Sequence, residues 1–171
     1  MVHAVTIDFP RTFLARVMPG ESLMGGFRRI LDVHRIQRAV ILSGIGSLVE
    51  ARFLGVQPGA KRPFGPKRIT QLEAQGPFEI LTLEGNIFPS GHTQIVHLHV
   101  ALGTSDGKVI GGHLVDGEVY TTVELFLAAL DHCRVRKVKD SVAGGIQLNI
   151  PTPGPSATAL HHRKPGRSRS R

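Results

Sequence analysis

Three histidines, His97, His99 and His113, are the residues whose types and spacing are best suited to chemistry. His97 and His99 lie in the apolar run 94–100, whose alternation is typical of a β-strand, so both imidazoles project from one face. His113 lies in the run 109–115 after a turn at 105–107, and pairing of the two strands as a hairpin would bring it opposite the first pair. Three neutral imidazoles on one wall suit Zn²⁺ or a similar divalent metal, and leave a coordination position open for water or substrate.

The same histidines have a second interpretation, in which the rings are half buried and bond only to protein atoms. Gly111 and Gly112 favour a metal, because they remove side chains beside His113 and allow a backbone or ligand to approach closely. A catalytic metal would also need a carboxylate to move protons. The candidates, each of which also fits a surface or sheet-edge position, are Glu84, Asp116, Glu118 and Glu124.

The elements around the histidines are predicted from hydrophobic periodicity. A strand over 13–17 precedes a helix that opens at Glu21-Ser22 and ends near His34-Arg35. A buried strand over 38–48 continues past a bend to 54, and a further strand covers 78–88. Residues 121–130 fit a strand or a helix, since their β-branched start and Leu/Ala-rich end disagree. This order predicts an α+β fold, a mostly antiparallel sheet packed with one main helix plus shorter elements.

Length and composition predict one domain and a tail. With 171 residues, 41% of them hydrophobic, the chain can bury one core. We expect an N-terminal extension over 1–10, the domain over 11–150, and a Pro-rich linker with a disordered basic tail over 151–171. No signal peptide or membrane segment is recognisable, so we expect a cytoplasmic protein with no membrane partner. The single cysteine, Cys133, excludes an internal disulfide.

Positive charge is concentrated in the tail. The formal net charge is +8, and residues 161–171 contribute five of these charges with no acid among them. Such a tail can contact the phosphates of DNA or RNA without reading sequence, and a solubilising end is the alternative. Two other basic clusters, over 61–68 and 134–139, are predicted to be solvated loop and edge-strand surface.

Five blocks in order carry a family resemblance: Pro-Gly-Glu before the helix, then residues 41–48, 76–85, 97–99 and 111–114. Together they resemble the plant and prokaryote conserved (PPC) domain from about residue 13 to about residue 130. The resemblance implies a compact domain with a major antiparallel sheet, homotrimers in bacterial and archaeal members, and a metal site at the three histidines. Pro77 replaces the arginine of the family block and would suit only a strand start or edge.

The resemblance favours a non-enzymatic, DNA-binding or regulatory homotrimer with a three-histidine metal site. The alternative is a zinc-dependent hydrolase, or a small-ligand-binding protein, that uses the same histidines. In the ligand-binding alternative, the backbone amides of residues 43–47 would contribute. The AT-hook of plant members is not carried over, because the tail has Lys-Pro-Gly-Arg over 164–167 where that motif has Arg-Gly-Arg-Pro.

Overall fold

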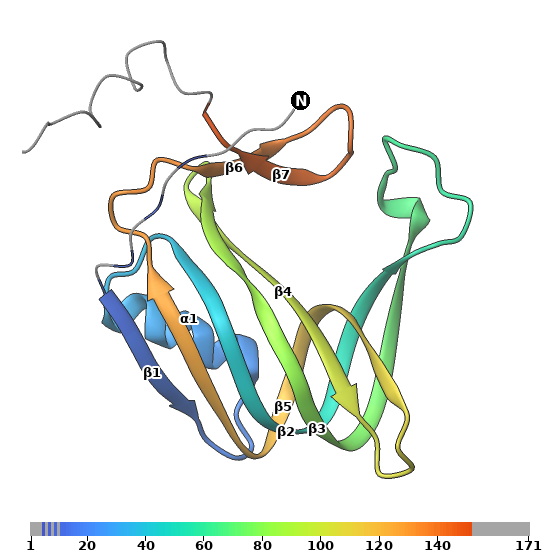
Figure 1. Cartoon of the computed structure of the whole chain (residues 1–171). Helices are drawn as coiled ribbons and strands as arrows, with labels where there is room; N and C mark the ends of the chain where they lie inside the picture. The colour runs from blue at the N-terminus through green and yellow to red at the C-terminus, as the bar shows by residue number, and fades with distance from the viewer. Residues whose placement is uncertain (1–4, 6, 8, 10, 152–171) are drawn as a thin grey trace, which may run out of the picture.

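The computed structural model describes residues 5, 7, 9 and 11–151 (Figure 1). The predicted basic tail, and most of the predicted N-terminal extension, lie outside the described residues. In chain order the elements are β1 (Arg11–Val17), α1 (Leu23–Val33), β2 (Ala39–Val56), the short 3-10 helix η1 (Pro66–Arg68), β3 (Ile69–Ser90), β4 (Thr93–Gly103), β5 (Val109–Ala129), β6 (Arg136–Lys139) and β7 (Ile146–Asn149).

Five strands form one antiparallel sheet in the order β1-β5-β2-β3-β4. Strand β5 also pairs with β4, so the sheet curls round on itself. Figure 1 shows the long, bent strands, with α1 beside the sheet and the hairpin β6–β7 across one end. The predicted α+β fold is confirmed, with one α-helix in the described part of the chain. No helix in that part is long and apolar enough to cross a membrane.

Helix α1 begins and ends where the sequence predicts. Ser22 caps it by accepting a hydrogen bond from the Gly25 N–H at 2.9 Å. The helix buries the apolar face of Leu23, Phe27 and Leu31. Asp116 of β5 accepts hydrogen bonds from the Ser22 hydroxyl and the Met24 N–H, which fixes the start of α1 against the sheet.

Strand β3 is longer than predicted. It begins at Ile69 and runs through Pro77, so Pro77 does not stand at the strand start. Pairing of β3 with β4 begins only at Glu79, so Pro77 lies where β3 has β2 on one side alone, and the expected edge position is confirmed. The pairing of β2 with β3 shifts register between Leu48 and Glu50, and Pro77 lies at this irregularity. A proline is tolerated there because the bulge needs no ladder N–H from it.

The segment 121–130, which fits a strand or a helix by sequence, is strand as far as Ala129. It forms the second half of β5 and lies between β1 and β2. Val123, Leu125 and Leu127 are buried on one face of it. Period-2 burial and pairing on both edges outweigh the helical propensity of the Leu/Ala-rich end.

Candidate metal centre

Alternation along β4 separates the histidines from the core. Leu98, Val100 and Leu102 are buried, whereas His97 and His99 occupy the intervening positions and face away from that core. Pairing of β4 with β5 places His113 directly opposite His99. The predicted approach of the three histidines is therefore confirmed.

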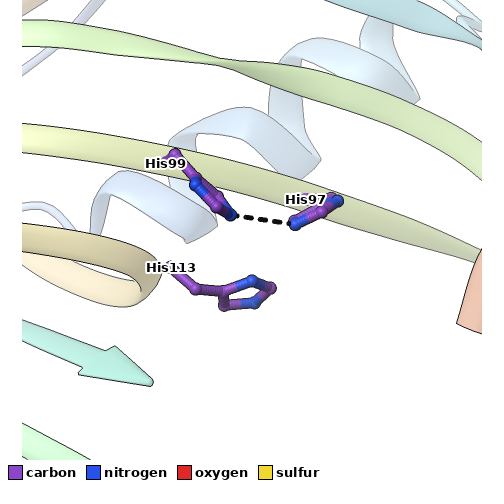
Figure 2. Close-up of side chains that lie close together, drawn as sticks. All are labelled: His97, His99 and His113. Atoms are coloured by element: carbon purple, nitrogen blue, oxygen red, sulfur yellow. Dashed lines mark hydrogen bonds between the residues drawn. The ribbon is translucent and has the colours of Figure 1, made fainter. Parts of the chain in front are cut away.

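The three rings converge on a small volume (Figure 2). The Nε2 atoms of His97 and His99 are 3.2 Å apart, and one ring nitrogen from each of the three histidines lies within 4.8 Å of the others. In a tetrahedral zinc site with Zn–N bonds of about 2.0–2.1 Å, two ligand nitrogens are about 3.3 Å apart. The donor set and its spacing therefore fit a divalent ion with small side-chain adjustments.

Glycines on both neighbouring strands bring the backbone close to β4. A Cβ on Gly85 of β3 would stand 2.1 Å from the His97 carbonyl oxygen. A Cβ on Gly111 of β5 would stand 2.1 Å from the Val100 carbonyl oxygen. The close approach predicted at Gly111 is confirmed, and its partner is backbone.

Burial favours the neutral, metal-binding form of His97 and His113. The pKa of His97 is lowered to about 4, first by burial and then by the positive charge of Lys137 and the other two rings. The pKa of His113 is also lowered, again mainly by burial, with His99 and Lys137 contributing. Both rings are therefore uncharged near neutral pH, with a lone pair available to a metal.

The prediction that the basic cluster over 134–139 is solvated surface is wrong for Lys137. Its side chain lies on β6 and is only 3% exposed, while Arg134, Arg136 and Lys139 are exposed as predicted. Burial lowers the pKa of Lys137 to about 8. Val135 and Lys137 are both buried, and this alternation is the sequence signal that could have marked Lys137 as buried. Strand β6 has only four residues, which is too short for the alternation to predict a strand.

Asn86 is a second residue that sequence reasoning missed. It lies on β3 directly opposite His97. Its Oδ1 atom is buried and has no hydrogen-bond partner among the described residues. An imidazole that ligates a metal through one nitrogen usually donates its other N–H to such an oxygen. An orphaned acceptor beside His97 therefore supports the fit of the site to a metal.

Of the four candidate carboxylates, one lies beside the histidines. Glu84 is opposite His99 in the pairing of β3 with β4. Asp116 has a structural role. It accepts a hydrogen bond from the Met24 N–H at the start of α1, and its Oδ2 atom lies 3.6 Å from an Nη atom of Arg52. Glu118 pairs with Ser22, and Glu124 pairs with Arg16 and Ile45 further along β5.

A cavity of about 400 Å³ adjoins the cluster. His97, His113 and Lys137 line it together with apolar side chains from three parts of the chain. A second cavity, of about 540 Å³, lies between His113 and α1, with Arg28 and Asp32 in its wall. Residues 43–47, predicted to offer amides to a ligand, lie within β2 and line neither cavity.

Comparison with known proteins identifies the family. The family model of the Plants and Prokaryotes Conserved (PCC) domain matches residues 7–131. The chain belongs to this family, the PPC domain. A PPC protein from Pyrococcus horikoshii is 29% identical with a TM-score of 0.71, covering 85% of this chain and 96% of its own. The metal-containing protein AF0104 from Archaeoglobus fulgidus is 27% identical with a TM-score of 0.75, covering 86% and 99%.

Two further similarities are more distant in length or sequence. The bifunctional protein GlmU of Synechococcus sp. (strain JA-3-3Ab) is 31% identical over 141 residues, which is 82% of this chain. The PPC chain spans about a fifth to a quarter of the length of the curated relatives it matches. A protein from Ralstonia eutropha JMP134, named "putative DNA-binding protein", is 21% identical with a TM-score of 0.68 over 81% of this chain and 90% of its own, and shares the fold.

Proposed function

We propose that this PPC chain binds one divalent metal ion, with zinc as the first choice, through His97, His99 and His113. The 3.2 Å separation of two Nε2 atoms, with the third histidine directly across the strand pair, carries the proposal. Three neutral nitrogen donors are the ligand set of open zinc sites. The similarity to the metal-containing protein from Archaeoglobus fulgidus also supports it.

The bound ion would supply a Lewis-acidic position for one small ligand. The chain's own residues have separate tasks around it. The three histidines hold the ion, Asn86 accepts the second N–H of His97, and Glu84 places a negative charge beside His99.

Metal content of the untagged protein, measured by elemental mass spectrometry after purification without added metal or chelator, tests the proposal. We expect about one zinc per chain, and a sharp loss of metal in His97→Ala, because two neutral nitrogens form a poor zinc site. His92 is exposed in the turn before β4 and outside the cluster, so His92→Ala is the matched control and should keep the metal. Wild-type protein that stays metal-free after exposure to zinc contradicts the proposal.

We further propose that the chain assembles as a homotrimer with a DNA-binding or regulatory role. The outer apolar face of the sheet, defined by Leu14, Ile45, Leu81 and Phe126, supports self-association because these side chains are 41–70% exposed. The net charge of +8, and the name of the Ralstonia protein, support contact with nucleic acid. Light scattering tests the trimer, and DNA binding at several salt concentrations tests the contact with nucleic acid.

A further inference from the structure

Among the described residues, Lys137 is a buried cation without an anionic partner. It is 3% exposed, and no carboxylate of the described residues lies within ion-pair distance of it. An ammonium that loses part of its hydration without gaining an anion is unfavourable, so proteins normally pair such a group. The lack of an anionic partner among the described residues favours a partner from outside the chain.

The neighbours of Lys137 increase the need for an anion. Lys137 lines the same cavity as His97 and His113, which places it beside the histidine cluster, and its positive charge acts on both rings. A divalent ion held by three neutral imidazoles would add two positive charges to the same region. Among the described residues, one carboxylate is in strand register with a cluster histidine. This is Glu84 of β3, which is exposed and lies opposite His99 of β4. A net positive charge would therefore remain.

The cavity beside Lys137 has room for a small molecule with an apolar body. Its volume of about 400 Å³ is at the lower end of the usual range for ligand pockets. Apart from the two histidines and Lys137, its walls are mostly hydrophobic, from Leu54, Val56, Phe64, Ile69, Ile95 and Ile146. The β6–β7 turn closes against the loop before η1, since a Cβ on Gly144 would lie 2.8 Å from the Phe64 carbonyl oxygen.

We propose that this cavity binds a small organic carboxylate, whose anionic group pairs with Lys137 beside the histidines and whose hydrocarbon part contacts the apolar wall. The inference rests on the proposed metal site in one respect, namely that the ion supplies the open position next to Lys137.

A carboxylate fits the lining better than a phosphate. A phosphate monoester carries close to two negative charges and three strongly hydrated oxygens, and is usually met by several N–H donors or arginines. Here one ammonium and one amide side chain, Gln147, are the non-histidine polar groups of the cavity wall. A carboxylate, with one negative charge and two oxygens, matches these two hydrogen-bonding groups.

Isothermal titration calorimetry of full-length, zinc-loaded protein tests the inference with hexanoate as the probe. Hexanamide is its neutral analogue, acetate lacks the chain, and inorganic phosphate is the competing anion. We expect hexanoate to bind at least about tenfold more tightly than hexanamide, because the neutral amide cannot form the charge-assisted bond. We also expect it to bind more than about tenfold more tightly than acetate, because each buried methylene contributes about threefold to fourfold.

Lys137→Met is the decisive variant, and Lys139→Met, at an exposed position of the same strand, is its matched control. We expect Lys137→Met to weaken hexanoate binding about tenfold or more while metal content stays at the wild-type value. Lys139→Met should bind as wild type does. Lys137→Gln, which keeps a polar end, serves if the methionine variant does not fold, and should show the same weakening.

The outcomes separate this inference from the metal proposal. Full metal content with equal hexanoate affinity in wild type and Lys137→Met overturns the carboxylate site alone. Tighter binding of phosphate than of hexanoate, or no hexanoate binding up to about 10 mM, also overturns it. Absence of metal from wild type overturns the metal proposal, and hexanoate titrated into that metal-free protein then decides whether Lys137 binds the carboxylate by itself.

Discussion

The buried Oδ1 atom of Asn86 gives the metal site a testable outer partner. Asn86 lies opposite His97, and that oxygen has no hydrogen-bond partner among the described residues. If His97 donates to it when a metal is bound, Asn86→Leu should lower metal affinity about tenfold to a hundredfold. Competition with a zinc chelator dye measures the affinity. The same substitution should leave the thermal stability of the metal-free protein unchanged or raised, since it removes an unpaired buried acceptor. Unchanged zinc affinity would exclude this role.

The lowered pKa of His97 makes the metal-free protein sensitive to acid. Its pKa is about 4 when folded, mainly because of burial, against about 6.5 in an unfolded chain. Between these values the unfolded chain binds a proton that the folded chain does not, so stability is full above about pH 6.5 and falls as the pH drops toward about 4. Urea denaturation of chelator-treated protein across this window should show the fall, and His97→Gln should show a shallower one. Equal slopes in the two proteins would contradict the assignment.

At the residue scale, the histidines were predictable and their neighbours were not. His97, His99 and His113 are marked by period-2 spacing and a nearby turn, which are local signals. Lys137 and Asn86 reach the cluster through tertiary packing of β6 and through the register of β3, which no local pattern encodes. The sequence predicts an exposed side chain for a lysine in a run of basic residues, because such runs are usually solvated.

At the element scale, the closeness of β3 to β4 depends on Gly85. A Cβ there would stand 2.1 Å from the His97 carbonyl oxygen and 2.9 Å from Leu98, so a methyl group forces the strands apart. We expect Gly85→Ala to lower the free energy of unfolding by about 2 kcal/mol and to weaken metal binding. Gly55→Ala in β2 is the control, since nothing lies within 4 Å of its Cβ position, and it should change stability by less than about 0.5 kcal/mol. Chemical denaturation and the dye assay measure both, and equal behaviour of the two variants would contradict the expectation.

Element types were predicted best where local signals agreed. Helix α1 has a serine cap and a regular apolar face, and its bounds were correct. Strand β3 was predicted too short because a proline was taken as its boundary. The strand continues through Pro77 because the pairing opposite Leu48 and Glu50 is irregular and because β4 pairs with β3 only from Glu79 onward. The end of β5 was ambiguous because pairing with β1 and β2, which decides it, joins residues more than 75 positions apart.

At the scale of the whole molecule, the outer apolar face predicts self-association. Leu14 and Phe126 are opposite one another in the pairing of β1 with β5, and are 70% and 41% exposed. We expect light scattering to give three times the 18.5 kDa chain mass, and Phe126→Glu to give a smaller species, because a buried charge opposes assembly. Val33→Glu alters another exposed apolar residue, at the end of α1, and should stay trimeric. A monomeric wild type would exclude the trimer.

The distribution of charge leads to a prediction about nucleic acid. Residues 161–171, outside the described part of the chain, carry five of the eight excess positive charges. If they bind phosphates, truncation after Ser156 should abolish most of the affinity for a mixed-sequence DNA duplex. It should also flatten the dependence of log K on log salt by about 0.9 for each phosphate that the shortened chain no longer neutralises. Fluorescence anisotropy at several salt concentrations measures both quantities.

Unchanged affinity and slope would place the binding surface on the domain, where the exposed basic residues of 61–68 offer the alternative. Equal affinity for duplexes of different sequence is expected in either case, because phosphate groups carry no sequence information.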